Sequence, residues 1–225
     1  METEPGCKTI PFNIQEKTTL KSIRKGSLLM VNMKTSLKNC LNCFCVALVF
    51  PLAVLSWFEK TINPASEVVF TFFAQLLACA PGLPGIFFRR AYYFSTVEKC
   101  SLCCVIGFGT LLVHRNVIIE RDVSIGNYAI IGCAHIKSDC EIGSRVSVTS
   151  GKNQHLKKPN GKWSSFDHLK AQRLIIQPDV WIGEGAIIMA EVGRETVVGA
   201  GSVVTEEIPA RVVAAGNPAR VLHTL

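Results

Sequence analysis

Residues 113–148 read VHRNVIIERDVSIGNYAIIGCAHIKSDCEIGSRVSV, and this run decides the fold because it carries an aliphatic residue at almost every sixth position. Small or β-branched residues recur four positions after each of these aliphatic residues. A period of six with this second small position is typical of a parallel β-helix, in which each short strand forms one face of a triangular prism. The expected inward-facing aliphatic residues are Val113, Ile119, Ile125, Ile130, Ile136, Ile142 and Val148.

A second run of the same kind begins at Ile176. Its expected inward-facing residues are Ile176, Ile182, Ile188, Val192, Val198 and Val204, with one step of only four residues. Residues 149–174 separate the two runs, and this polar stretch, SGKNQHLKKPNGKWSSFDH at its centre, shows no such period. We therefore expect a β-helix over 105–225 with an excursion loop over 149–174. Glycines at the expected corners, such as Gly183 and Gly199, suit tight turns.

The chain ahead of the repeats divides into two segments. Residues 1–38 are polar and contain seven Lys or Arg between Lys8 and Lys38, so we expect a basic tail, with a surface helix near 14–33. Such a charge cluster suits an anionic membrane surface. Nucleic acid is the weaker interpretation, because the basic residues are not interleaved with aromatic ones and no nucleic-acid motif is present.

Residues 39–104 form an apolar, predicted helical region. The ranges 41–58 and 68–88 contain no charge, and the first is just long enough to cross a hydrocarbon core of about 30 Å. We expect a membrane-associated helical hairpin or a shallow re-entrant element, with the outer, basic flanks in the cytoplasm. The alternative is a helical subdomain buried against the rest of the protein.

The ten cysteines include two CxxC pairs, Cys40/Cys43 and Cys100/Cys103. Two such pairs can hold zinc. The first pair opens an apolar run and lies far from the second, which favours buried or lipid-facing thiols in a reducing compartment. We therefore expect no metal site.

Three motifs extend the interpretation: the loop SGKNQH, the block VWIGEGAIIM, and the ending VGAGSVVTEEIPARVVAAGNPARVL. With them the chain resembles the hexapeptide-repeat acyltransferases, in particular the branch of xenobiotic, galactoside, maltose and serine acetyltransferases. The resemblance covers roughly residues 105–223. It implies a left-handed parallel β-helix, a homotrimer, and acyl-CoA sites in the clefts between neighbouring subunits.

The resemblance also implies roles for individual residues. His155, in the excursion, matches the catalytic histidine, and Trp181 matches an aromatic residue that shapes the acceptor region. Gly183, Ala200, Thr205 and Arg220 match positions that contact CoA, and Arg211 could add charge near its phosphates. An imidazole whose pKa lies near the working pH can take the proton of an attacking hydroxyl as a general base.

Each of these residues also has an alternative interpretation. His155 could be an exposed loop residue, His168 in the same loop is the second candidate for the base, and Asp167 and Glu184 are candidates for a carboxylate that orients it. Trp181 could be a rim aromatic, and Arg220 a solvated tail residue. His114 and His135 are expected on the prism surface.

The sequence thus predicts a CoA-dependent O-acyltransferase of the O-acetyl type, with a hydroxyl of a sugar, a lipid-linked molecule or another amphiphile as acceptor. We expect a membrane-associated protein whose catalytic domain lies in the cytoplasm. An N-acyltransferase acting on an amino sugar, or a catalytically silent β-helix that serves as a membrane assembly module, are the alternatives.

Overall fold

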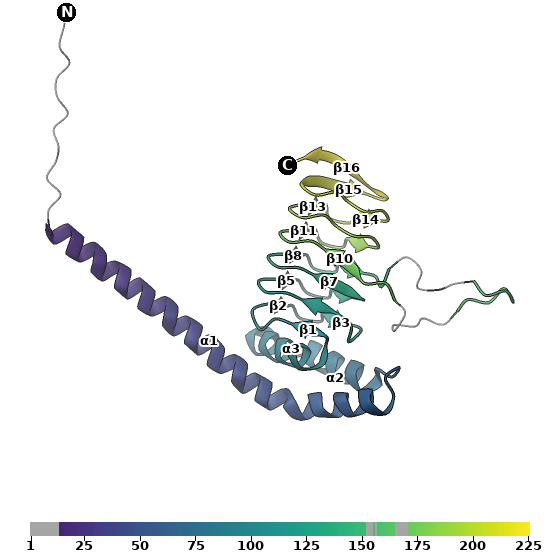
Figure 1. Ribbon diagram of the computed structural model, residues 1–225, viewed down its shortest axis with the longest axis horizontal. Helices are drawn as coiled ribbons and strands as arrows, with labels where there is room; N and C mark the ends of the chain where they lie inside the picture. The colour runs from purple at the N-terminus through teal and green to yellow at the C-terminus, as the bar shows by residue number, and fades with distance from the viewer. Residues whose placement is uncertain (1–13, 152–154, 156, 165–170) are drawn as a thin grey trace, which may run out of the picture. The chain divides into compact units, whose positions relative to one another are not determined.

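A computed structural model describes residues 14–151, 155, 157–164 and 171–225, with side chains from Ser36 onward (Figure 1). The chain forms two compact units, residues 1–41 and residues 42–225. The first unit contributes the beginning of helix α1 (Ile14–Ile62), which contains Pro51 and ends in the second unit. The surface helix expected near 14–33 is therefore the first part of a longer helix.

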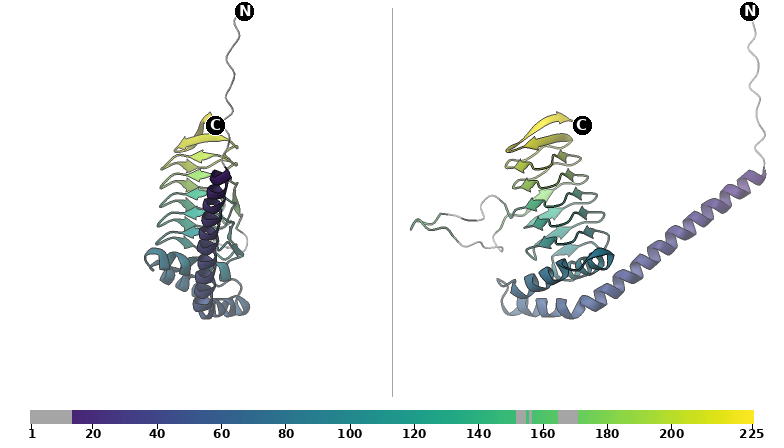
Figure 2. Two further views of the ribbon diagram at one scale, coloured as in Figure 1. Left: turned by 90° about the vertical axis from the view of Figure 1, so that its left-hand side faces the viewer. Right: turned by 180° about the vertical axis from the view of Figure 1, so that it is seen from behind.

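Two shorter helices follow and lie beneath the coil of strands (Figures 1 and 2). Helix α2 (Val68–Ala78) buries Phe70 and Ala74, and α3 (Gly82–Thr96) buries Tyr92 and Tyr93. The sequence PGLPG, residues 81–85, follows the break after α2 and forms the N-cap and first turn of α3. Prolines fit there because the first helical turn has no intrahelical partners for its N–H groups.

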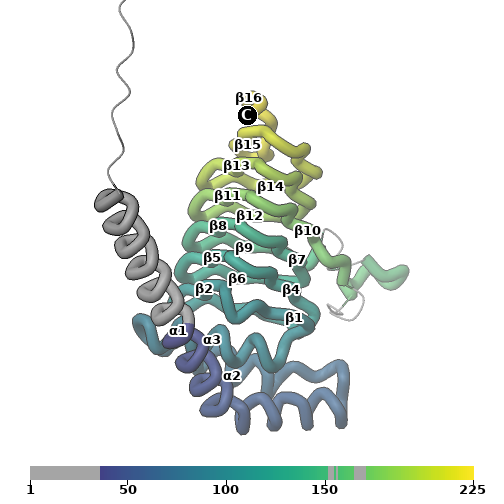
Figure 3. The backbone as a smooth tube through the Cα atoms, turned by 60° about the vertical axis from the view of Figure 1, so that its left-hand side comes forward, coloured from purple at the N-terminus to yellow at the C-terminus, as the bar shows by residue number. Residues whose placement is uncertain are grey.

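In the part of the chain that the structure describes, sixteen short strands build three sheets, which form the sides of the coil (Figure 3). The first sheet contains β1 (Lys99–Cys100), β4 (Ile118–Ile119), β7 (Ala134–Ile136) and β10 (Leu174–Ile176). The second contains β2 (Val105–Ile106), β5 (Ser124–Ile125), β8 (Glu141–Ile142), β11 (Trp181–Ile182), β13 (Val197–Val198), β15 (Val212–Gly216) and β16 (Ala219–Thr224). The third contains β3 (Leu111–Leu112), β6 (Ile130–Ile131), β9 (Ser147–Val148), β12 (Ile187–Ile188) and β14 (Val203–Val204).

The neighbouring strands of each sheet run parallel, apart from the antiparallel pair β15 and β16 that closes the coil. The predicted parallel β-helix is thereby confirmed. Its first strand, β1, pairs with β4 in parallel, so the coil already begins at Lys99, ahead of the predicted start at residue 105.

The core of the coil follows the predicted period, with one correction. Ile119, Ile125, Ile136, Ile142 and Val148 are buried as expected. Ile130, however, is 49% exposed, and its neighbour Ile131 is completely buried; likewise Leu112, rather than Val113, fills the core. The predicted register is wrong by one residue at these two strands. Each contains or adjoins two neighbouring aliphatic residues, and because side chains alternate along a strand, only one of the two can point into the core.

Backbone geometry at the corners explains how the coil turns. At the corner that leads into the second sheet, Asp122, Asp139, Asp179, Glu195 and Arg211 all have φ between 56° and 62°. Their backbone N–H groups donate to the preceding coil, as from Asp139 to the carbonyl of Arg121 at 3.3 Å. The predicted corner glycine Gly183 is instead required by stacking, because a Cβ there would lie 2.5 Å from the backbone nitrogen of Ala200 in the next coil.

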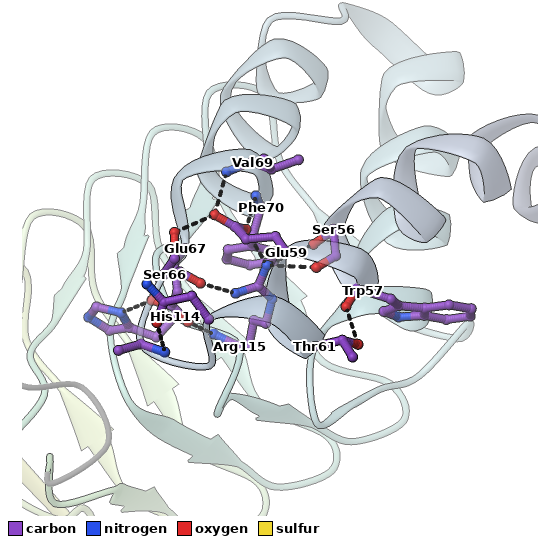
Figure 4. A network of polar contacts seen from close by, with 12 residues as sticks. Ser56, Trp57, Glu59, Thr61, Ser66, Glu67, Val69, Phe70, His114 and Arg115 are labelled. Carbon is purple, nitrogen blue, oxygen red and sulfur yellow. Dashed lines mark hydrogen bonds and ion pairs between the residues drawn. The ribbon is translucent and has the colours of Figure 1, made fainter.

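A buried polar network joins α1 and α2 to the first coil (Figure 4). The Arg115 guanidinium donates to the Glu59 carboxylate at 2.6 Å and to the carbonyl oxygens of Ser56 and Ser66. Glu59 also accepts bonds from the backbone N–H groups at the start of α2. Burial alone would raise the pKa of the Glu59 carboxyl, but these bonds and the one from Ser66 outweigh it and lower the pKa to about 2.

Candidate active site

The excursion that carries His155 leaves the coil at one corner and returns without disturbing it. It begins after β9, where the backbone N–H of Thr149 donates to Ile188, and ends at β10, where Leu174 pairs with Ala134. The hydroxyl of Ser150, which is 6% exposed, accepts the backbone N–H of Cys133 at 3.0 Å. The root of the excursion is therefore fixed to the neighbouring coils by backbone and side-chain bonds.

His155 is exposed, and its Nδ1 lies 2.9 Å from the carbonyl oxygen of Ser164, across the excursion. A carbonyl oxygen can only accept, so Nδ1 carries the proton in this contact and Nε2 is the basic nitrogen of the neutral ring. A general base needs an unprotonated ring nitrogen, which in this tautomer is Nε2. Of the other predicted residues in the excursion, His168 and Asp167 lie outside the described residues.

A hollow at the root of the excursion provides space beside the coil. Its volume is about 280 Å³, and its walls are formed by Gln172, Leu174, Met189, Ala190, Glu191 and Glu207. Thr205 follows β14 at this same corner, directly after Val204, whose carbonyl accepts the N–H of Met189. The structure thus brings the predicted CoA residue Thr205 to the corner from which the excursion departs.

Trp181 lies on a different side of the coil. It is 59% exposed on β11, in the second sheet, where it flanks Glu141 and Val197 on the neighbouring strands. Its ring helps to line a hollow of about 500 Å³, together with Asp179 and Arg211. The Arg211 guanidinium donates to the Glu195 carboxylate at 2.8 Å.

Ala200 and Arg220 lie towards the C-terminal end of the coil. Ala200 is exposed at the corner between the second and third sheets, beside Gly201, whose φ of +67° suits a glycine. Arg220 is exposed on β16, opposite Ala215, and Nη1 donates only locally, to the carbonyl of Ala219 at 3.0 Å. Glu184, a candidate to orient His155, lies at the same corner as Ala200, where its carbonyl accepts the N–H of Gly201.

Within one chain, the predicted site residues are therefore distributed around the prism. Thr205 and the excursion share one corner, Ala200 lies at another, and Trp181 lies near the third. The hollow lined by Trp181 contains neither Ala200 nor Arg220, and the hollow at the root of the excursion contains none of these three residues.

Two histidines expected on the prism surface are partly buried and paired with carboxylates. His114 Nδ1 lies 2.7 Å from Glu67, and His135 Nε2 lies 2.7 Å from Glu120. The His135 pair spans adjacent coils, and the bond from His135 contributes to lowering the pKa of Glu120, which burial would otherwise raise. A carboxylate one coil below a histidine is a signal that the sequence register could have provided; Glu67, which lies in the helical region, could not be found this way.

The two CxxC pairs do not form a ligand cluster. Cys100 is buried beside Cys104, with the two sulfur atoms 3.7 Å apart, whereas Cys103 is exposed. Across the part of the chain that the structure describes, no group of three or more His, Cys, Asp or Glu side chains is arranged to hold a metal ion.

Part of the chain is similar in sequence to known acetyltransferases. A galactoside O-acetyltransferase of Escherichia coli (strain K12) is 39% identical over 82 residues, which are 36% of this chain and 37% of that protein. A 2,3,4,5-tetrahydropyridine-2,6-dicarboxylate N-acetyltransferase of Staphylococcus aureus (strain bovine RF122 / ET3-1) is 38% identical over 76 residues, 33% of this chain and 32% of that protein. The matches thus span about a third of each curated relative. No family model matches the chain.

Among solved structures, a galactoside acetyltransferase in complex with coenzyme A resembles the fold, with a TM-score of 0.52 and 21% identity. The likeness covers 70% of this chain and 80% of that one. The three-sided parallel coil with its six-residue period is thus similar in fold, and over about a third of its length in sequence, to acetyltransferases. These similarities support the expected resemblance to the hexapeptide-repeat acyltransferases.

Proposed function

We propose that the protein is an acetyltransferase that moves an acetyl group from acetyl-CoA to a hydroxyl of a small or lipid-linked acceptor, with His155 as the base. The observation that carries this proposal is the bond from His155 Nδ1 to the Ser164 carbonyl, which makes Nε2 the basic nitrogen on a loop that projects from the coil. The similarity to a galactoside O-acetyltransferase supports the choice of reaction.

The reaction assigned to this site requires one proton relay. His155 Nε2 removes the proton of the acceptor hydroxyl as its oxygen attacks the thioester carbonyl, which forms the new C–O bond and a tetrahedral oxyanion. The oxyanion collapses, the C–S bond breaks, and the departing CoA sulfur takes the proton from the imidazolium. Hydrogen-bond donors around the oxyanion would lower its energy further.

The dispersed residues support a site shared between copies, which we propose to be a homotrimer. The Ala200 and Arg220 end of one copy, together with Thr205, would bind CoA, the exposed Trp181 would shape the acceptor region, and the excursion of a neighbouring copy would supply His155. Arg220 suits CoA phosphates because its guanidinium can bond two oxygens at once. We further propose that the protein is held at a membrane, with its coil in the cytoplasm, which favours an amphiphilic acceptor.

Release of the CoA thiol from acetyl-CoA, measured against a panel of galactosides and lipid-linked sugars, tests the proposal. Replacing His155 by Ala should lower kcat by about 10²–10⁴-fold at an unchanged affinity for acetyl-CoA. Arg220→Glu should instead weaken acetyl-CoA binding, whereas Arg121→Glu, on another exposed arginine of the coil, should not. Full turnover by His155→Ala would show that His155 is not the base, and absence of turnover by the unaltered chain with every acceptor would favour the catalytically silent module.

A mixing experiment tests the shared site. Copies with His155→Ala and copies with Arg220→Glu, each nearly inactive alone, should regain partial activity when they are unfolded and reassembled together. Absence of recovery in mixed trimers would place the whole site within one chain. Amine acceptors belong in the same panel, because the similarity to an N-acetyltransferase favours an amino sugar as the second candidate.

A further inference from the structure

The base of the second unit presents an apolar surface with almost no charge. Its exposed large side chains come from α1, α2 and the start of α3 and include Phe44, Leu48, Phe50, Val54, Leu55, Trp57, Phe58, Ile62, Val68, Phe72, Leu76 and Leu83. Between residues 42 and 88 the charged residues are Glu59, Lys60 and Glu67, and the side chains of both glutamates are 11% exposed or less. Lys60 is therefore the one exposed charge of this base surface.

A surface of this size and composition indicates a partner, because soluble monomers rarely expose such a continuous apolar area. The segment Ser36–Ile62 is long and apolar enough to cross a membrane by length and composition alone. Only 28% of its most apolar stretch is buried inside the protein, unlike the core helix of a soluble domain. Helix α2, with 11 residues, reaches only about 16 Å and cannot cross a hydrocarbon core of about 30 Å.

The other face of α1 is attached to the rest of the second unit between Asn42 and Glu59. Asn42, Cys45, Val49, Ala53 and Ser56 form a buried stripe at helical spacing. At one end, Asn42 donates to the carbonyl of Leu102 at 3.4 Å and accepts a bond from Arg90. At the other end, 17 residues further on, Glu59 is bound by Arg115.

These two attachments restrict how α1 can meet a bilayer. Seventeen residues of α-helix extend about 25 Å, nearly the thickness of the hydrocarbon core. Leu102 and Arg115 both belong to the first coil, so an upright α1 would carry the polar edge of that coil, together with the Glu59 carboxylate, into the hydrocarbon. Neither is tolerated there, because no water is present to satisfy polar groups.

We infer that the base surface is a monotopic membrane-binding face: residues 43–62, α2 and the start of α3 lie within one leaflet, and the coil stands on it in the aqueous phase. This inference specifies how the proposed membrane association occurs and does not depend on the catalytic proposal. Of the two arrangements expected for the apolar segments, it favours the shallow element over the helical hairpin.

A lipid bilayer suits this face better than a protein partner does. The segment ahead of it carries seven Lys or Arg between Lys8 and Lys38, which favours anionic headgroups. Trp57, 42% exposed at the edge of the face, has its indole N–H bonded to the Ser95 carbonyl at 2.8 Å, so an apolar ring points outward while its polar group is satisfied. A hollow of about 450 Å³ between α1 and α2 has Leu55, Phe58, Ile62 and Val69 on its apolar wall and Glu59, Asn63 and Ser66 on its polar wall, and its apolar wall offers room for part of an acyl chain.

Flotation of the full chain with vesicles of phosphatidylcholine and phosphatidylglycerol tests the face itself. Phe72→Asp combined with Leu76→Asp, on the exposed side of α2, should weaken vesicle binding by about 100-fold. Leu222→Asp, which alters an equally exposed residue on β16, is the matched control and should bind as the unaltered chain does. A base-to-base dimer in solution that these changes dissociate, with no binding to vesicles, would overturn the inference.

Protease protection then distinguishes a monotopic face from a spanning helix. The full chain, with a different epitope tag at each end, is expressed, and sealed membrane vesicles of one orientation are treated with protease. Both tags should be digested in the same preparation, because both ends lie on one side. Protection of the N-terminal tag with digestion of the C-terminal tag would show that α1 crosses the membrane and would refute the monotopic arrangement, while leaving the proposed enzymatic function untouched.

Discussion

Replacement of Arg115 by Met should destabilise the base of the protein more than any ordinary surface change. The Arg115 side chain is 7% exposed and Glu59 is 9% exposed, so the pair is shielded from water. The guanidinium makes four hydrogen bonds: to Ser66 at 2.8 Å, to the carbonyl and hydroxyl oxygens of Ser56 at 3.1 and 3.0 Å, and to Glu59 at 2.6 Å. Methionine fills a similar volume but leaves the carboxylate buried without a cation, which costs about 3–5 kcal/mol.

Urea unfolding in detergent micelles, followed by the fluorescence of Trp57, measures this cost. Trp163 and Trp181 are first replaced by Phe, so that the signal comes from the base, where Trp57 is bonded to Ser95. The double change Glu59→Gln with Arg115→Met removes both charges and should recover part of the loss, because no buried charge then lacks a partner. A loss below about 1 kcal/mol for Arg115→Met would refute the reasoning, since that is the range of exposed ion pairs.

Acid titration of the same proteins tests the sign. The pKa of Glu59 is lowered from its ordinary value of 4.5 to about 2, so its contribution to stability is fully present above pH 4.5 and is lost as the pH falls towards 2. The difference in free energy of unfolding between the unaltered chain and Arg115→Met should therefore shrink across this interval. A difference that stays constant between pH 5 and pH 2 would contradict a charged Glu59.

Two further predictions concern the coil. Ile131→Ala should cost about 2–5 kcal/mol in thermal unfolding followed by circular dichroism, because Ile131 is completely buried, whereas Ile130→Ala, at an exposed neighbour, should cost less than about 1 kcal/mol; equal effects would contradict the register. At neutral pH a maleimide should modify the exposed Cys103, while Cys140, whose pKa burial raises to about 11, should react only after unfolding; peptide mass spectrometry of the labelled chain compares the two.

The sequence predicted the coil well because its period has a direct physical cause. A residue every sixth position must point inward for the strands to stack, so Ile119, Ile125 and Ile142 could be placed without coordinates. The register failed only where two aliphatic residues are adjacent, at Leu112 and Val113 and at Ile130 and Ile131. There the sequence contains no information about which side chain the corner leaves room for.

The helical base and the site were less predictable. Composition indicated that 39–104 is apolar and helical, but the attachment of α1 to the coil depends on Arg115 and Glu59, which lie 56 residues apart and carry no periodic signal. The predicted site residues came from motifs, and the structure places Trp181, Thr205 and Ala200 at separate parts of the prism. The contacts between copies of the chain depend on the shapes of their surfaces, which cannot be predicted from one sequence.

The continuity of the first sheet across the excursion has a consequence for how such proteins diversify. Strand β10 pairs with β7 in register, Ile176 opposite Ile136, although some twenty-five residues leave the coil between Val148 and Leu174. Doubling the length of a flexible loop costs only about 0.6 kcal/mol in closure entropy. The corner therefore acts as an insertion point at which mutation can lengthen, shorten or rewrite the segment that we propose reaches the substrate, while selection on folding acts on the strands to either side. New acceptors can be acquired at this corner without any change in the architecture that supports it.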